Sequence, residues 1–161
     1  MKQIAPQSAA WLRAFRVYLS VIVIGNVTWE IIQLPLYTIW STGTRREQTF
    51  AVVHCTLGDF LIALSALMLA LLMIGRAGWP NERFWPVAVA ATILGIAYTG
   101  FSEWLNVVVR ASWSYSERMP VISLFGFNVG LSPLLQWLVV PAAAFRITRA
   151  VTVKKGNGGP P

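Results

Sequence analysis

Hydrophobic residues gather along this chain into four long runs, and short polar segments separate them. The runs cover approximately residues 14–40, 50–74, 84–109 and 131–147. A helix needs about 20 apolar residues, at 1.5 Å each, to cross the roughly 30 Å hydrocarbon core of a bilayer. The pattern therefore predicts an all-α integral membrane protein in which four transmembrane helices form a compact bundle.

The fourth run is short for such a span. We therefore expect residues 121–130, which include Gly126 and Gly130, to form a short interfacial or re-entrant segment before the fourth helix. Residues 1–149 are predicted to be a single transmembrane domain. Residues 150–161 are basic and then rich in Gly and Pro, and we expect this tail to be disordered because it has little apolar surface to bury.

Composition supports a membrane protein. Only 12% of the 161 residues are charged and 56% are hydrophobic, with a mean hydropathy of +0.60. Soluble domains carry about 25% charged residues. The net charge of +7 comes from Lys and Arg at the ends of the apolar runs and not from one basic face, so membrane orientation explains it and nucleic-acid binding is not expected. The architecture resembles that of small multi-span inner-membrane proteins in general.

The positive charges predict an orientation. With four spans, one side of the membrane carries nine Lys and Arg residues: Lys2, Arg13, Arg16, Arg76, Arg83, Arg146, Arg149, Lys154 and Lys155. The other side carries four: Arg45, Arg46, Arg110 and Arg118. Because Lys and Arg favour the cytoplasmic side, we expect a multi-pass protein of the inner (plasma) membrane with both termini in the cytoplasm.

Polar residues inside the runs converge on one depth. In the predicted topology, the outer halves of the helices contain Glu30, His54, Asp59, Glu103, Asn106 and Gln136. The inner halves are aliphatic. An ionisable group at the centre of a membrane helix costs roughly 2.5–3.5 kcal/mol on insertion scales, so each acid should face the bundle interior. The pattern predicts an outward-facing acidic pocket, edged by Trp29, Trp104 and Trp137.

Helical spacing divides these residues into faces. One face of the first helix carries Asn26, Glu30, Gln33 and Tyr37, and one face of the third carries Thr99, Glu103, Asn106 and Arg110. Arg110 is placed to neutralise Glu103, and His54 to pair with one of the other acids. We interpret Glu30, Asp59, Glu103 and His54 as candidate catalytic residues. The candidate ligand-binding residues are Asn26, Gln33, Trp29, Trp104, Asn106, Arg110, Tyr115 and Gln136.

A structural role is the alternative for each of these residues. Buried polar side chains also join membrane helices to one another, so the acids and amides can serve packing alone. For His54, the sequence favours a hydrogen-bonded, non-catalytic imidazole over a catalytic one. Cys55 is interpreted as a small apolar filler.

The residue inventory excludes several kinds of site. A single histidine excludes bis-histidine haem and a His-rich zinc centre, and a single cysteine excludes an intrachain disulfide and Cys-based metal clusters. The chain contains no P-loop, no dinucleotide-binding glycine motif and no Gly-x-Ser-x-Gly elbow. Glu30, Asp59 and Glu103 are suitable ligands for a hard divalent cation, but no spacing indicates one, so no metal site or cofactor is predicted.

Three functions remain open. The first is a binding protein or enzyme that takes an apolar or amphipathic, lipid-like ligand from the outer leaflet and uses paired carboxylates for acid/base chemistry such as isomerisation or cyclisation. The second is an accessory or assembly subunit of a larger membrane complex. The third is a proton or cation transporter, whose path a homo-oligomer would have to complete because the inner helix halves lack polar residues.

Overall fold

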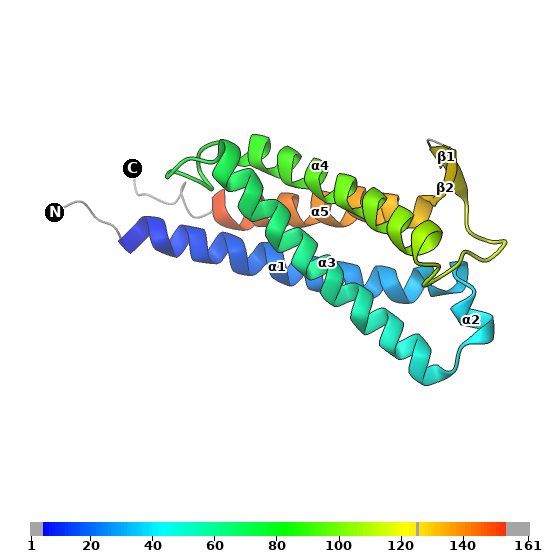
Figure 1. The fold of residues 1–161 in the computed structure, drawn as a ribbon. Coiled ribbons are helices and arrows are strands. Elements are labelled where there is room, and N and C mark those ends of the chain that lie inside the picture. Colours follow the sequence, from blue (N-terminus) through cyan, green and yellow to red (C-terminus); the bar gives the residue numbers. More distant parts are fainter. Residues whose placement is uncertain (1–4, 125, 154–161) are drawn as a thin grey trace.

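The computed structural model describes residues 5–124 and 126–153. Figure 1 shows an elongated helical bundle with a small β-hairpin at one end. In chain order the elements are α1 (Ala5–Gln33), the 3₁₀ turn η1 (Leu34–Leu36), α2 (Ile39–Thr42), α3 (Arg45–Ile74), α4 (Phe84–Glu103), the π-helical segment η2 (Trp104–Val109), β1 (Val121–Leu124), β2 (Phe127–Gly130) and α5 (Leu131–Val153). Of residues 150–161, which the sequence predicts to be disordered, 150–153 are helical, so the prediction is wrong for them, and 154–161 lie outside the described residues.

Four helical segments are long and apolar enough to cross a membrane, as the hydrophobic pattern predicts. They are Gln7–Leu36, Arg45–Ile74, Phe84–Val109 and Leu131–Thr152. The first and fourth differ in their bounds from the sequence prediction, which placed them at about 14–40 and 131–147. The first helix begins earlier and ends earlier, and the fourth continues beyond Ile147, so it is long enough to span after all.

Local chemistry explains where two of these helices begin and end. Pro35 cannot donate a backbone hydrogen bond and disfavours helical geometry at the preceding residue, so α1 gives way to η1 after Gln33. The third element begins at a capping box, in which Thr44 accepts from the Glu47 N–H and the Glu47 carboxylate accepts from the Thr44 N–H. This cap fixes the start of α3 at Arg45, five residues before the apolar run itself begins.

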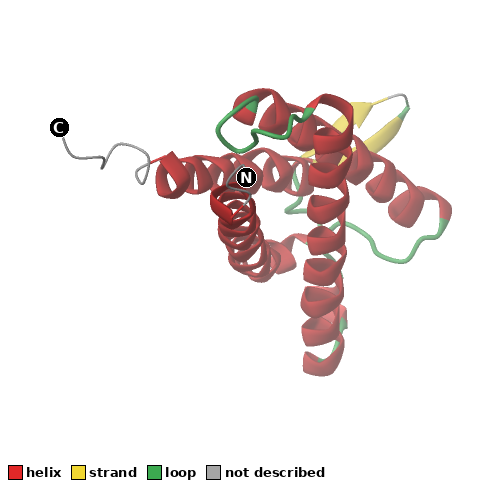
Figure 2. Cartoon of the chain, turned by 90° about the vertical axis from the view of Figure 1, so that its left-hand side faces the viewer, coloured by secondary structure: helices red, strands yellow, loops and turns green. Residues whose placement is uncertain are grey.

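The buried core lies toward the end of the bundle where α1 begins and α5 ends, which we call the terminal end and which faces the viewer in Figure 2. The opposite end, which carries α2 and the hairpin, is the α2 end (Figure 1). Small side chains let the backbones approach at the terminal end, as is common between membrane helices. The buried core there includes Tyr18, Ala63, Leu67, Ala70, Trp79, Phe84, Val87, Ala88, Ala91 and Phe145.

Helix α3 diverges from the rest of the bundle toward the α2 end. Figure 1 shows α3 crossing in front of α1, with its C-terminal turns near α4 and its first turns far from α4. Its buried side chains are Thr56, Ala63, Ala66, Leu67 and Ala70, so the stretch before Thr56 contributes none. The divergence leaves a space between α3 and the other three long helices.

Residues 121–130 form a β-hairpin, which sequence periodicity did not predict. The two strands are antiparallel, with Val121 opposite Gly130 and Leu124 opposite Phe127. Gly126 has φ of 84°, a left-handed conformation that glycine adopts without steric cost and that a tight turn requires. Pairing within the hairpin satisfies the backbone groups of a segment too short to form a spanning helix.

Candidate functional site

The space beside α3 is a cavity of about 730 Å³ at the α2 end of the bundle. Residues of α1, α3, α4, η2 and the first turns of α5 form its walls, and α2 and residues 110–114 lie over it. Glu30, Asp59 and Glu103 come from three different helices, and all three line this cavity. The tertiary structure therefore brings together the three acids that the sequence places at a common depth.

Gln136 of α5 connects two of these acids. Its Nε2 lies 2.8 Å from Asp59 Oδ2, 3.2 Å from Glu30 Oε1 and 3.1 Å from Asn26 Oδ1. A side-chain amide carries only two N–H hydrogens, so the three oxygens compete for them. The contact joins α1, α3 and α5 at one buried point and places the Glu30 and Asp59 carboxyl groups beside each other.

Gln33 provides a second layer of support for Glu30. Its Nε2 donates to Glu30 Oε1 at 2.8 Å and to Gln136 Oε1 at 3.3 Å. The Ser132 hydroxyl donates to Gln33 Oε1 at 2.8 Å, and the Trp29 indole N–H donates to Ser132 at 3.2 Å. This chain of bonds fixes the orientation of Gln33, so its N–H groups point at the acid. Ser132 was not among the predicted site residues, because a single serine at a helix start gives no periodic signal.

Glu103 has a different partner from the one that the sequence predicts. The Tyr115 hydroxyl donates to the Glu103 carboxylate and accepts a hydrogen bond from the Gly130 N–H at 2.9 Å. Arg110 lines the cavity but is exposed, and within the residues that the structure describes no ion pair joins it to Glu103. The predicted Glu103–Arg110 pair is therefore wrong: helical spacing brings Arg110 to the same face, but about two turns of helix separate the two side chains along the axis.

Tyr115 and its loop are held against η1. The Tyr37 and Tyr115 rings lie 5.7 Å apart, the Thr38 N–H donates to Ser114 O at 3.0 Å, and the Ser116 N–H donates to Leu36 O at 2.9 Å. Burial, and then the negative charge of Glu103, raise the pKa of Tyr37. Burial, followed by the hydrogen bond to Glu103, raises the pKa of Tyr115. Both phenols therefore stay protonated, and Tyr115 remains a hydrogen-bond donor.

The helix that carries Glu103 widens immediately after it. The α-helical pattern ends at Glu103 and η2 follows as a π-helix, with the Arg110 N–H bonded to Leu105 O at 2.8 Å. Single π-helical turns occur often at functional sites. The change from α- to π-helix does not separate the four residues that the sequence places on one helical face. All of them line the cavity: Thr99, Glu103, Asn106 and Arg110.

The remaining predicted site residues occupy three kinds of position. Glu30, Gln33, His54 and Gln136 line the cavity together with Asp59. Asn26, Trp29 and Tyr115 stand behind the lining and contact it through hydrogen bonds. Trp104 is 37% exposed, its ring lies 5.9 Å from that of Phe101, and it is not among the lining residues.

His54 does not make the predicted pair with an acid. It is exposed, and its ring stacks on that of Phe50 at 5.5 Å. In the described parts of the chain no ion pair involves it, because it lies more than a helical turn from Asp59 along α3, nearer the helix start. It therefore lies toward the open side of the cavity and not beside the acids.

The cavity wall also contains polar groups without protein partners. Thr99 is 6% exposed, and its buried hydroxyl has no hydrogen-bond partner; the buried indole N–H of Trp113 likewise has none. Both residues line the cavity. Gly58 lines it as well, and a Cβ placed there would meet no atom within 4 Å. These residues leave polar groups and space available to a bound molecule.

Among the described residues, no group of three or more His, Cys, Asp or Glu side chains is placed to hold a metal ion.

No known protein family, curated protein or solved structure matches this chain. Four helices that are long and apolar enough to cross a membrane surround an acidic cavity, as expected of a multi-pass membrane protein.

Proposed function

We propose that this chain is a small inner-membrane protein that binds an apolar or amphipathic molecule in the cavity and transforms it by carboxylate acid/base chemistry. The observation that supports this proposal most directly is that Glu30, Asp59 and Glu103, from three helices, face one cavity of about 730 Å³. Within the described residues none of these acids has a cationic partner, so pairing of charges does not account for their burial. Acids that only joined helices would not require an adjoining space.

The arrangement of donors supports distinct roles for the acids. Gln33 and Gln136 donate to Glu30, and Gln136 also donates to Asp59, so these two carboxyl groups share one set of amide donors. Glu103 is held separately by a phenol. Two carboxyl groups in close contact favour a shared proton, whereas a singly held carboxylate serves as a proton acceptor. Proton abstraction at one position and donation at another, as in isomerisation or cyclisation, requires such a pair of environments.

Orientation in the membrane follows from the charge pattern. The terminal end carries the larger number of Lys and Arg residues, which supports a cytoplasmic location for both termini. The α2 end then faces outward, and the cavity lies at the depth of the outer leaflet. A molecule from that leaflet is the natural occupant.

The terminal end of the bundle disfavours transport through a single chain. Its buried core is formed by side chains such as Ala63, Leu67, Ala70, Val87 and Ala91, which offer no binding step for a proton or cation. An accessory-subunit role remains the main alternative, and it predicts a protein partner in place of a small molecule.

Conservative amide substitutions test the proposal. Glu30→Gln, Asp59→Asn and Glu103→Gln keep the size of each side chain but remove its charge and its proton-transfer capacity. Native mass spectrometry of the purified protein should show a co-purified small molecule that each variant loses or retains unprocessed. Glu82→Gln and Glu117→Gln are controls, because both residues are exposed and neither lines the cavity. Normal retention and processing in all three amide variants, or co-purification of a protein partner alone, would contradict the proposal.

A further inference from the structure

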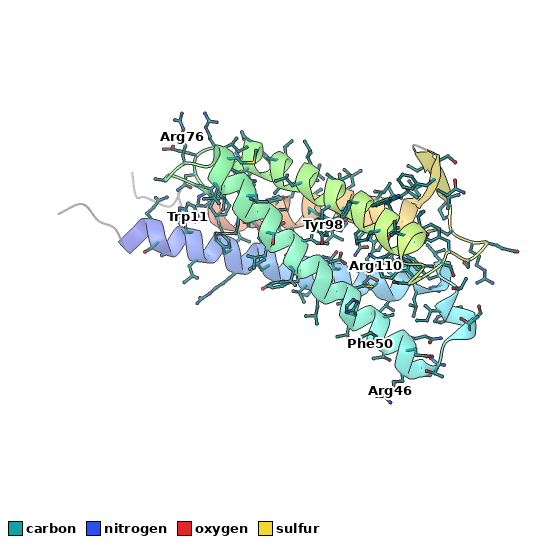
Figure 3. All side chains as sticks on the ribbon, in the orientation of Figure 1. Trp11, Arg46, Phe50, Arg76, Tyr98 and Arg110 are labelled. Atoms are coloured by element: carbon teal, nitrogen blue, oxygen red, sulfur yellow. The ribbon has the colours of Figure 1, made fainter. Side chains whose placement is uncertain are left out.

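The cavity reaches the surface on the side where α3 and α4 diverge. Phe50 and His54 on α3, and Arg110 after η2, line the cavity and are also exposed; Phe50 is 67% exposed. In Figure 3 the labelled Phe50 and Arg110 lie on the two sides of this gap, with α1 behind it. Residues that both line a cavity and meet the exterior mark an opening, and at the α2 end Thr42, Glu47, Ser112 and Ser114 mark a second one.

The opening between α3 and α4 lies beside two candidate spans: its α3 residues belong to Arg45–Ile74, and Arg110 directly follows Phe84–Val109. In a bilayer that these spans cross, an apolar tail in the gap would lie next to the lipid chains. Inside the gap, Gly58 contributes no side chain, and open space surrounds it.

Hydrogen-bond acceptors outnumber donors at the closed end of the cavity. Three carboxyl groups offer about four lone-pair positions each, whereas the described donors to them are the amides of Gln33 and Gln136, the phenol of Tyr115 and the indole of Trp137, which bonds to Asp59. Thr99, one helical turn before Glu103, adds a buried hydroxyl without a partner. A ligand that completes this site must bring donors, and in a medium of low dielectric it must also offset negative charge.

We propose that the ligand is a long-chain amine that enters sideways between α3 and α4, with its ammonium group among Glu30, Asp59, Glu103 and Thr99 and its tail extending past Gly58 toward the lipid. An ammonium group carries three donors, no acceptor and one positive charge, which is the complement of this end of the cavity. A fatty acid is disfavoured because its carboxylate would meet like charges. The inference rests on the proposed function and specifies the ligand class of the same site.

Dodecylamine, dodecanol and dodecanoate test the polar group, since the three probes share one tail. Binding to the purified protein in phosphatidylcholine nanodiscs is measured by native mass spectrometry against empty nanodiscs. We expect dodecylamine to bind at least ten times more tightly than dodecanol, and dodecanoate not to bind. Asp59→Asn and Glu103→Gln should each weaken dodecylamine binding at least tenfold, whereas Glu82→Gln should leave it unchanged.

A matched pair of glycine substitutions tests the route. Gly58→Trp adds a large ring to the cavity wall and leaves all three acids in the sequence, so it should abolish dodecylamine binding. Gly100→Trp is the control, because Gly100 also has open space around it but lies on α4 outside the cavity lining. Circular dichroism and thermal unfolding establish that both variants fold.

The outcomes separate the two proposals. Equal binding of dodecanol and dodecylamine, both lost in Gly58→Trp, would overturn the amine and leave the cavity as a ligand site. Dodecylamine binding that survives Gly58→Trp would overturn the lateral route, because the probe would then be dissolved in the bilayer or held elsewhere. Absence of probe binding together with absence of any co-purified molecule would overturn the proposed function as well.

Discussion

The Tyr115 hydroxyl donates a hydrogen bond to the Glu103 carboxylate, which lies 12 residues earlier in the chain. The same hydroxyl accepts from the Gly130 N–H at 2.9 Å. One phenol thus connects the end of α4, the loop over the cavity and the start of α5. The position of Glu103 in the cavity depends on a residue outside the spans.

Tyr115→Phe should loosen this connection while keeping the aromatic ring against Tyr37. A hydrogen bond to a charged group contributes about 1.5–3 kcal/mol, so we expect a loss of stability in that range. Thermal unfolding in detergent measures the loss, and hydrogen exchange should accelerate within residues 111–119. Tyr98→Phe is the control, because Tyr98 is 52% exposed and lies outside the cavity. Equal behaviour of the two variants would mean that the Tyr115 hydroxyl contributes nothing to the loop.

Gln136→Met should destabilise the bundle although it changes the volume of the side chain very little. Methionine has nearly the same volume but cannot donate to Asp59, Glu30 or Asn26. Leaving a buried polar group without its partner costs about 1–3 kcal/mol. Thermal unfolding should show this loss, whereas Leu138→Met, at a 53% exposed position on the same helix, should change stability little. An unchanged melting temperature for Gln136→Met would show that the three oxygens have other donors.

Two glycines of α4 should respond in opposite ways to alanine. A Cβ at Gly95 would collide with the indole ring of Trp137, which is 2% exposed. Overpacking of this kind costs about 1–3 kcal/mol. A Cβ at Gly100 would meet no atom within 4 Å, so Gly100→Ala should stabilise by up to about 1 kcal/mol through helix propensity. The difference in melting temperature between the two variants is the measurement, and a tolerated Gly95→Ala would contradict the close α4–α5 contact.

Reporter fusions test the proposed orientation. A reporter fused after Lys155 should behave as cytoplasmic, and one inserted at Thr42–Gly43, between α2 and α3, as periplasmic, because six of the ten described Arg residues lie toward the terminal end. Alkaline phosphatase and fluorescent-protein fusions give complementary signals on the two sides. The opposite result would place the cavity at the depth of the inner leaflet and remove the outer leaflet as the source of its ligand.

The four spans were predictable because hydrophobicity and length are local properties of the chain. Phe84–Val109 matches the predicted run, and Arg45–Ile74 begins five residues earlier because of the Thr44 cap. The first span ends earlier than predicted, next to Pro35, and both effects act on neighbouring backbone groups. Helical spacing also predicted the cavity-lining face of the third helix from Thr99 to Arg110. A residue's face follows directly from the 3.6-residue repeat, so no tertiary information is needed to find it.

Partners across helices depended on the tertiary structure. Spacing placed Arg110 and Glu103 on one stripe, yet the Glu103 carboxylate bonds to Tyr115 from a loop, and Gln136 reaches Asp59 across 77 positions of sequence. Such contacts depend on how far one helix slides and tilts against another, and the packing of residues such as Gly95 on Trp137 sets that tilt. The divergence of α3, which creates the cavity, has the same origin: close packing of small residues at the terminal end fixes one half of the helix and leaves the other half free of neighbours.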